Sequence, residues 1–384
     1  MSSQPRPVVK FSSPTDIVGV VPLRVGFVPT ESIVVVCLHG PRRRAGLVMR
    51  HDLVPIEQLE ELADVLAWHV RRAEADGVIL VVYTDAPDVD GSLPQHEFVD
   101  DLVDRLGIEV VECLLVRQGR WWSYSCALAC CPPEGTPIPS EPQGPAAIVS
   151  AAAAFDGRAV LADRAALEAS IRPRRGPLSD GARMLAFDQA AQAVIAAAED
   201  GADALTAETM ALLESAASRW AAGERDLAPV EAARIVLGLS SKWCRDYAAT
   251  LALDLDDDAY LSFLTELCQR TDDEWAAPVC TVLAWVAYAH GDGALANVAV
   301  DRALAAEPDY EMARLLLRGL QGQMPPAEVR ALLGNVRRDM EAIARGETPS
   351  FERELARRRG SRSRQPPLRQ ARRTRAARRR RKAR

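Results

Sequence analysis

A proline-rich stretch near residue 140 separates two parts of the chain that must fold in different ways. Six prolines lie between positions 132 and 145, among few side chains that could pack in a core. Proline fixes its φ angle and has no amide hydrogen, so this stretch cannot continue a helix or a central strand. We expect an ordered loop or linker here.

Ahead of the prolines, apolar runs of strand length alternate with segments of helical periodicity. The run at 78–83, Val-Ile-Leu-Val-Val-Tyr, is typical of a buried strand. We expect strands at 8–11, 32–38, 45–53, 78–83, 108–117 and 120–126, and helices at 15–25, 55–75 and 95–106. Pro22 should kink the first helix or end its regular part. Hairpins at both ends favour a mixed sheet, so we predict an α/β domain over residues 1–140.

After the prolines the composition shifts to Ala, Leu, Glu and Arg, and the periodicity is helical throughout. We predict an all-α helical domain over residues 141–346, with helices near 145–155, 163–171, 179–200, 205–222, 229–238, 243–253, 257–270, 275–290, 293–306, 309–320 and 325–345. Small and apolar residues match one TPR-like helix pair with Gly291-Asp292 at its turn: Leu283, Ala284, Ala296, Val300, Ala303, Leu304 and Pro308.

Charge is divided unequally along the chain. Residues 357–384 contain 15 Lys and Arg and no Asp or Glu, whereas residues 1–356 contain 32 basic and 53 acidic residues, a net charge of −21. We expect residues 347–384 to form a disordered Arg-rich tail. Such a tail binds phosphate polymers, including nucleic acid, without sequence preference, or it lies on the acidic body. The candidate contact residues are Arg372, Arg373, Arg375, Arg378, Arg379, Arg380, Arg381, Lys382 and Arg384.

The apolar runs are too short for a membrane span, which needs roughly 18 residues. The first residues are not followed by an apolar signal segment, so we expect a cytoplasmic protein without membrane contact. The eight cysteines should then be thiols and not disulfides. Those that stand singly in apolar segments should be buried: Cys37, Cys113, Cys244, Cys268 and Cys280.

The stretch from Arg120 to Pro139 is dense in uncommon residue types. Arg-Trp-Trp-Ser-Tyr-Ser-Cys at 120–126 is followed by Cys-Cys-Pro-Pro-Glu-Gly-Thr-Pro-Ile-Pro at 130–139. Neighbouring strand residues point to opposite faces, so Trp122 and Tyr124 share one face and Trp121 lies on the other. An exposed Trp122–Tyr124 pair could form a binding platform, but we expect the helical domain to pack on it. The candidate binding residues are Trp122, Tyr124, Arg120 and Glu134.

Three cysteines of this stretch, Cys126, Cys130 and Cys131, suggest metal or redox chemistry at first sight. Zinc and iron–sulfur centres usually take four ligands, presented in Cys-x-x-Cys pairs. Here three cysteines stand at spacings of four and one, and His96 or Cys113 could join them only if the fold brings them close. We therefore favour thiols packed beneath the prolines, with a metal site or a disulfide as alternatives. The cofactor, if there is one, is unknown.

The same stretch belongs to a pattern that resembles a known family. The other parts are Ser-Pro-Thr-Asp-Ile at 13–17 through Pro22, Gly-Phe-Val-Pro-Thr-Glu-Ser-Ile-Val-Val-Val at 26–36, Gly-Asp-Gly-Ala-Leu-Ala at 291–296 and Ala-Leu-Ala-Ala-Glu-Pro-Asp-Tyr at 303–310. Together they resemble the DUF4192 family, a family of unknown function found mostly in actinobacteria. The resemblance covers about residues 8–345 and implies no catalytic residue, and the tail is not part of it.

Other polar groups are weaker candidates. His51 and Asp52 are neighbours in a strand, face opposite sides and do not form a dyad by themselves. The loop after the strand at 78–83 carries Asp85, Asp88 and Asp90, at a place where α/β ligand sites often lie, although such loops are more often solvated turns. The chain has no Walker loop, no Gly-x-Gly-x-x-Gly after a strand and no Gly-x-Ser-x-Gly elbow.

Without a catalytic constellation, the sequence favours a non-enzymatic protein-interaction module that binds an unidentified protein partner. Its tail would add contact with phosphate polymers. The alternative is an enzyme or ligand-binding protein with a metal- or thiol-dependent site at the domain junction, near the Trp-Trp-Ser-Tyr and Cys-Cys-Pro-Pro segment.

Overall fold

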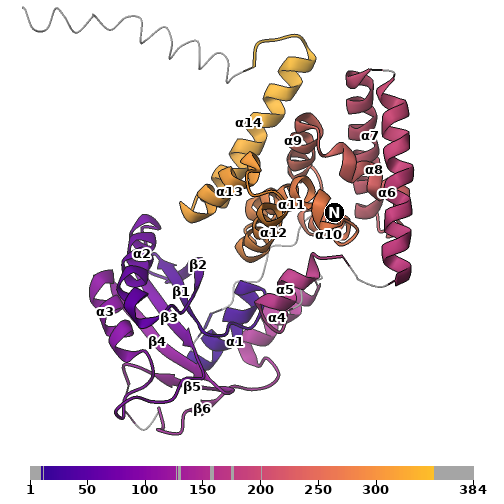
Figure 1. Cartoon of the computed structure of the whole chain (residues 1–384). Helices are drawn as coiled ribbons and strands as arrows, with labels where there is room; N and C mark the ends of the chain where they lie inside the picture. Colours follow the sequence, from indigo (N-terminus) through magenta and orange to yellow (C-terminus); the bar gives the residue numbers. More distant parts are fainter. Residues whose placement is uncertain are drawn as a thin grey trace, which may run out of the picture.

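The computed structural model shows a strand-rich N-terminal part followed by a helical part (Figure 1). It describes residues 10–11, 13–126, 128, 131–155, 160–173, 177–199 and 201–349. Lys10 and Phe11 lie outside any strand, so the strand predicted at 8–11 is wrong for these two residues, and its first two residues are not described. The predicted tail is outside the described residues from Ser350 onward.

Six strands form one mixed sheet in the order β2-β1-β3-β4-β5-β6. β3 and β4 run parallel, and the other neighbouring pairs are antiparallel. The strands are β1 (Ser32–His39), β2 (Arg44–Asp52), β3 (Gly77–Tyr83), β4 (Glu109–Arg117), β5 (Arg120–Ser123) and β6 (Thr136–Pro137). The predicted mixed sheet is confirmed, although β5 ends three residues earlier than expected and β6 lies inside the predicted loop.

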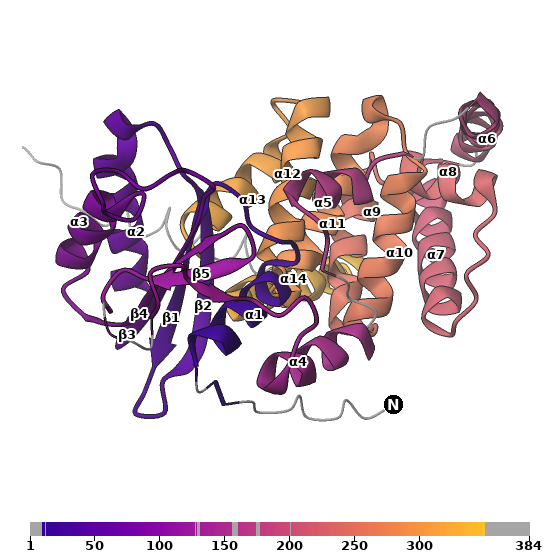
Figure 2. The same cartoon turned by 90° about the horizontal axis from the view of Figure 1, so that it is seen from below.

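Different parts of the chain cover the two faces of the sheet (Figure 2). β1 and β3 are buried on both faces, because apolar residues fill nearly every position. On one face Val35 and Leu80 pack with the helices α2 (Leu59–Arg72) and α3 (His96–Leu106), and we name it the α2–α3 face. A short 3-10 helix, η1 (Ile56–Gln58), precedes α2. On the other face Val34 and Val81 share a cluster with α1 (Pro14–Val25), and we name it the α1 face.

The helix α1 begins with the predicted cap. The Ser13 hydroxyl accepts from the amide of Asp16 at 3.2 Å, and the Asp16 carboxylate accepts from the amide of Ser13 at 3.1 Å. The helix continues for three residues beyond Pro22 and ends at Gly26, whose φ of 88° is left-handed. Pro22 therefore does not end α1, because the following turn is held by the bond from the Gly26 amide to the Pro22 carbonyl.

The helices after β6 lie within about three residues of the predicted ranges. They are α4 (Gly144–Phe155), α5 (Arg164–Ser170), α6 (Pro177–Ala198), α7 (Ala202–Ala221), α8 (Pro229–Gly238), α9 (Lys242–Thr250), η2 (Leu251–Leu253), α10 (Asp257–Gln269), η3 (Asp273–Trp275), α11 (Ala276–His290), α12 (Gly293–Ala306), α13 (Glu311–Gln321) and α14 (Pro326–Ala344). α4 packs against α1, next to the sheet. The boundaries expected at 140 and 346 stay predictions.

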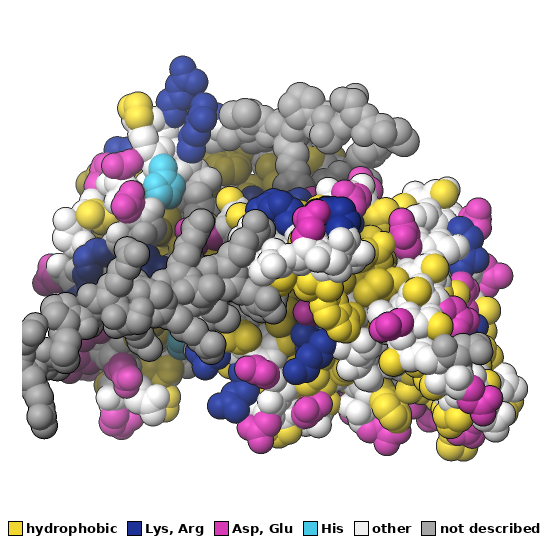
Figure 3. All heavy atoms as spheres, turned by 90° about the horizontal axis from the view of Figure 1, so that it is seen from above, with side chains coloured by type: hydrophobic (Ala, Val, Ile, Leu, Met, Phe, Trp, Pro, Cys, Tyr) yellow, Lys and Arg dark blue, Asp and Glu magenta, His cyan; other side chains and the backbone are white. Residues whose placement is uncertain are grey.

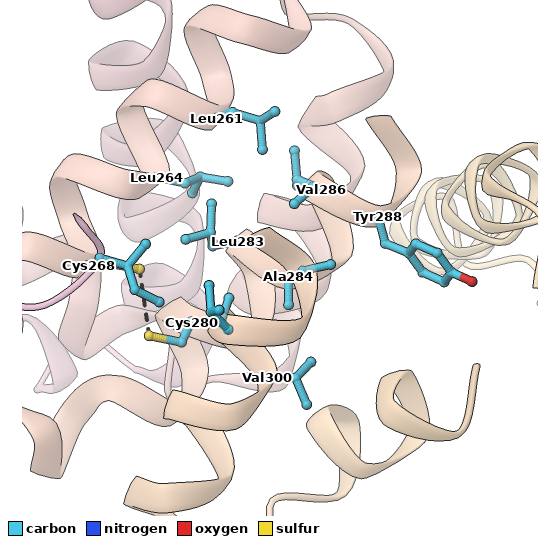
Figure 4. Close-up of a cluster of buried hydrophobic side chains, with 14 of the residues drawn as sticks. Leu261, Leu264, Cys268, Cys280, Leu283, Ala284, Val286, Tyr288 and Val300 are labelled. Carbon is cyan, nitrogen blue, oxygen red and sulfur yellow. Dashed lines mark hydrogen bonds between the residues drawn. The ribbon is translucent and has the colours of Figure 1, made fainter. Parts of the chain in front are cut away.

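The helix α11 is the centre of the helical part. Twelve of its fifteen residues are buried, and Leu283 and Val286 face Leu261 and Leu264 of α10 (Figure 4). The same hydrophobic cluster includes Leu114 of β4 on the α1 face of the sheet. A fully buried leucine contributes about 1.5–3 kcal/mol, so this continuous core is what holds the helical part against the sheet.

Candidate functional site

The β4–β5 hairpin presents the two tryptophans to opposite faces of the sheet, as predicted. Gln118 and Gly119 both have positive φ, 48° and 72°, which suits a two-residue hairpin turn. Trp121 lies on the α1 face, 5 % exposed, and its indole nitrogen donates to Thr15 Oγ1 of α1 at 3.0 Å. Trp121 thus fastens the edge of the sheet to α1.

We expected the helical domain to cover Trp122 and Tyr124. Both instead lie on the α2–α3 face of the sheet. The Trp122 indole donates to the Pro133 carbonyl at 2.9 Å, and the Arg117 guanidinium stands 4.8 Å from the centre of its ring. Tyr124 donates to the Pro94 carbonyl at 2.6 Å, and burial raises the pKa of its hydroxyl. The expectation is wrong because both faces of β4 are apolar, so alternation alone cannot say which face the helical part covers.

Arg120 holds the loop that contains Glu134. Its guanidinium donates to the Glu134 carbonyl at 2.8 Å and to the Gly135 carbonyl at 2.9 Å. The Glu134 side chain is exposed. The polar atoms of Arg120 and Trp122 contact backbone carbonyls of the 133–135 segment, and Tyr124 contacts the Pro94 carbonyl ahead of α3, while a binding role for these residues and Glu134 stays a prediction.

The cysteine cluster is only partly described, since Cys130 lies outside the described residues. Cys126 and Cys131 are half-buried, and the Cys131 amide donates to the Leu128 carbonyl at 2.8 Å. Cys113 is buried, and burial raises the pKa of its thiol to about 12. Among the residues that the structure describes, no three His, Cys, Asp or Glu side chains stand close enough to hold a metal ion.

The acidic loop after β3 is tied to the sheet by its own contacts. Asp88 pairs with Arg117 at 2.8 Å, and Asp85 accepts from the Gln118 amide at 3.3 Å. Asp90 has a φ of 51° in the turn that joins Val89 to Ser92. These carboxylates therefore shape the loop.

Glu31 closes the same end of the sheet, where the parallel strands β3 and β4 end. Thr84 Oγ1 donates to its carboxylate at 2.9 Å, and the Asp85 amide donates at 3.0 Å. On β2, His51 is exposed and its ring nitrogen lies 2.9 Å from the Asp52 carbonyl. Arg50 pairs with the Asp52 carboxylate at 2.5 Å, so His51 and Asp52 form no dyad.

Sequence reasoning missed Ser32 and Tyr83 at this end. Both are buried, and the register pairs them across β1 and β3 on the α1 face. A signal was available, because each is the polar end of an otherwise apolar strand. Whether two such residues share a face depends on the register of the strands, which the sequence pattern alone does not give.

The outer helix α6 exposes an unusual number of apolar side chains. Met184 is 66 % exposed, Leu185 59 % and Ile195 67 %, while Ala186 and Ala190 pack against α8. Large apolar side chains gathered on an exposed helix often mark an interaction site, although α6 also exposes the polar Asp188 and Gln189. Figure 3 shows hydrophobic and acidic side chains intermixed over this end of the helical part.

A hollow of about 250 Å³ opens beside α6. It is lined by Ala182, Arg183, Ala186, Phe187, Pro229, Glu266, Gln269 and Arg270. Phe187 stacks on Trp275 of η3 with 6.3 Å between ring centres, and Trp275 is 38 % exposed. We call α6, η3 and this hollow the α6 surface.

Comparison with known protein families identifies the family to which the chain belongs. The model of the DUF4192 family, a domain of unknown function, matches residues 14–327. The chain belongs to the DUF4192 family. The match covers the sheet, the helices α1 to α13 and the start of α14, so the DUF4192 region contains the α6 surface and the end of the sheet near Tyr83.

The basic tail lies beyond the DUF4192 match. No curated protein and no solved structure matches the chain. In the part of the DUF4192 chain that the structure describes, every helix is too short or too polar to cross a bilayer.

Proposed function

We propose that this DUF4192 protein is a cytoplasmic, non-enzymatic interaction module that binds a protein partner at the α6 surface. The observation that carries the proposal is the exposure of Met184, Leu185 and Ile195 on one helix. Exposed apolar side chains beside a hollow with an aromatic lining residue are typical of protein interfaces, in which a few buried anchors supply most of the binding energy.

The charge around the α6 surface selects the kind of partner. Residues 177–275 contain 19 Asp and Glu against 7 Lys and Arg, a net charge of −12. A second copy of this surface would be repelled, because like charges in an interface oppose association. The partner that fits is an amphipathic helix with an apolar face and flanking basic residues.

The hollow gives this partner a place for one anchoring side chain. Phe187 lines the hollow and is stacked on Trp275, while the rim charges are already paired within the protein, as in the bond from Arg270 to Glu266 at 2.7 Å. An apolar anchor therefore meets no uncompensated charge when it enters.

The test uses two synthetic helices of equal length, one of Leu and Lys and one of Leu and Glu. Fluorescence anisotropy should show that the Leu/Lys helix binds the full chain at least about tenfold more tightly than the Leu/Glu helix. Replacing Leu185 and Ile195 by Gln removes apolar area without changing charge, and should weaken that binding about tenfold.

Ile56→Gln is the matched control, because Ile56 is 75 % exposed in η1, away from the α6 surface. This variant should bind the Leu/Lys helix like the wild type. Equal binding of the two helices, or equal binding by the double variant and the wild type, would sink the proposal.

The tail would add a second, electrostatic contact. Residues 357–384 carry 15 basic residues, and we propose that they bind phosphate polymers without sequence preference. Full-length protein should bind a mixed-sequence duplex with an affinity that falls steeply as salt rises, and a chain truncated after 356 should not bind. Retained duplex binding by the truncated chain would place the contact elsewhere.

A further inference from the structure

The register of the sheet places several polar side chains in one row on the α1 face. Ser32 pairs with Asp52 of β2 on one side and with Tyr83 of β3 on the other. Tyr83 in turn pairs with Val116, and Val116 with Trp121. Polar side chains at this position are unusual, because a sheet that is covered on both faces normally carries apolar side chains on each of them.

Three polar atoms of this region are buried and lack hydrogen-bond partners among the described residues: Ser32 Oγ, Tyr83 Oη and Arg50 Nε. Ser32 is fully buried, Tyr83 is 5 % exposed, and the Arg50 side chain is 12 % exposed. More than nine in ten buried polar groups are hydrogen-bonded, so three such atoms on neighbouring strands need a reason.

The guanidinium of Arg50 bonds to groups on two segments that flank Ser32. Its terminal nitrogen bonds to the Asp52 carboxylate at 2.5 Å and to the Thr30 carbonyl at 3.2 Å. Asp52 is the strand partner of Ser32, and Thr30 precedes Ser32 by two residues, so Arg50 reaches across this position. The ring of Phe27 covers the guanidinium, with 5.7 Å between the ring centre and Cζ.

The buried atoms of this region offer hydrogen-bond donors, and the exposed carboxylate beside them offers acceptors. Arg50 Nε only donates, and burial raises the pKa of the Tyr83 hydroxyl, which keeps its proton. Asp52, whose side chain is 66 % exposed, offers an acceptor at the surface. Asp52, Glu31 and Asp85 outnumber the single cation of Arg50, so an anionic ligand would be repelled.

We propose that Ser32, Tyr83 and Asp52 of this row, with Arg50 from the next row of the same face, bind a neutral small molecule through an amide group. Its carbonyl oxygen accepts from Ser32, Tyr83 and Arg50, and its N–H donates to Asp52. The place agrees with the general position of α/β ligand sites, since it adjoins the carboxyl ends of the parallel strands β3 and β4. The site is separate from the α6 surface, and neither proposal depends on the other.

The first test compares tyrosines with and without a partner in the free protein. Tyr83→Phe and Ser32→Ala remove hydroxyls that make no bond to the described residues, so the melting temperature should stay constant or rise. Tyr260→Phe is the control, because Tyr260 donates to the Ala248 carbonyl at 2.6 Å, and its removal should lower the melting temperature by a few degrees. Equal losses in Tyr83→Phe, Ser32→Ala and Tyr260→Phe would show a structural role and overturn the proposal.

The second test uses benzamide and benzoate, which differ only in the proposed amide group. Saturation-transfer NMR on the full chain should detect benzamide binding and a weaker response or none for benzoate. In the double variant of Ser32→Ala and Tyr83→Phe, benzamide affinity should fall about tenfold. Three outcomes would overturn the proposal: no benzamide binding, benzoate binding of equal or greater strength, or benzamide binding that the double variant retains.

Discussion

At the scale of single residues, Gly135 explains why the Pro132–Gly135 loop can close over Trp122. Its φ of +75° favours glycine, and a Cβ at this position would lie 2.4 Å from Trp122 Cε2. We predict that Gly135→Ala lowers the free energy of unfolding by about 3 kcal/mol, through backbone strain and overpacking together. Urea unfolding measures this loss.

Gly91→Ala is the matched control for that experiment. Gly91 has a similar φ of +80°, but nothing lies within 4 Å of the added Cβ. Only the backbone strain remains, so the loss should be about 1 kcal/mol. Equal losses at the two glycines would mean that the contact with Trp122 does not constrain the corner.

The cysteines should differ sharply in reactivity. Cys37, Cys113, Cys244, Cys268 and Cys280 are buried, and burial raises the pKa of Cys37 to about 11 and that of Cys113 to about 12. The Sγ atoms of Cys268 and Cys280 lie 3.7 Å apart (Figure 4), well beyond a disulfide bond of about 2.05 Å.

A thiol titration of the native protein at pH 8 should therefore detect at most three of the eight cysteines. The five buried thiols should react only after unfolding in guanidinium. Rapid reaction of more than three thiols in the native state would contradict the packing described for these residues.

His69 should make stability depend on pH. Burial lowers its pKa below the usual 6.5, and the charges of His51 and Arg72 act in the same direction, while a hydrogen bond with Gln323 acts in the opposite one. The unfolded chain then binds the proton more readily than the folded one. The contribution of His69 to the free energy of unfolding is therefore fully present above about pH 6.5 and is lost as the pH falls below that value.

Urea midpoints at pH 7.5 and pH 5.5 test this for the wild type and for His69→Gln, which cannot titrate. The wild type should lose more stability between the two values than the variant. The same pH dependence in both proteins would show that His69 is not responsible.

At the scale of secondary-structure elements, Arg302 links α12 to three others, α5, α10 and η3. It projects from α12, is 3 % exposed, and donates to the carbonyls of Cys268 at 2.9 Å and Thr271 at 2.6 Å. It also bonds to the Ile171 carbonyl after α5 and to Asp273 in η3 at 3.2 Å. The ends of α5 and α10 are thus held to α12 by one buried cation.

We predict that Arg302→Met lowers the free energy of unfolding by about 3 kcal/mol or more, because buried carbonyls lose their donor. Arg314→Met on α13 is the control. Arg314 pairs with Asp309 at 2.9 Å, but both side chains are exposed, so its loss should stay within about 0.5 kcal/mol. Similar unfolding curves for both variants would rule out the joining role of Arg302.

The elements also show what sequence patterns can and cannot predict. Helical periodicity located α4 to α14 well, because each helix buries an apolar stripe. The strand β6 was hidden, since Thr136-Pro137 is only two residues long and proline suits just an edge strand. Periodicity placed Trp121 and Trp122 on opposite faces, but the choice of face depends on α1, which is distant in sequence.

The candidate sites were less predictable for a related reason. Arg120, Trp122 and Tyr124 stand out as uncommon residues, yet the bonds that occupy them come from carbonyls of Pro94, Pro133 and the 134–135 segment. Ser32 and Tyr83 are ordinary residue types, and only the register of β1 and β3 brings them together. The α6 surface depends on exposure, which no local pattern reports.

At the scale of the whole molecule, a sheet and a helical part share one hydrophobic core, and α6, at the far end of the helical part, leaves Met184, Leu185 and Ile195 exposed. The body around that surface is acidic and the tail is basic. The tail could therefore compete with a basic partner for the α6 surface, and its removal should then strengthen binding of the Leu/Lys helix.

Hydrogen–deuterium exchange of the full chain with and without the Leu/Lys helix tests the proposed binding surface most directly. The bound helix should slow exchange in residues 177–198 of α6 and around η3 at 273–275, and leave the sheet unchanged. No protection in α6, or protection confined to the sheet, would contradict the interaction role proposed for this protein.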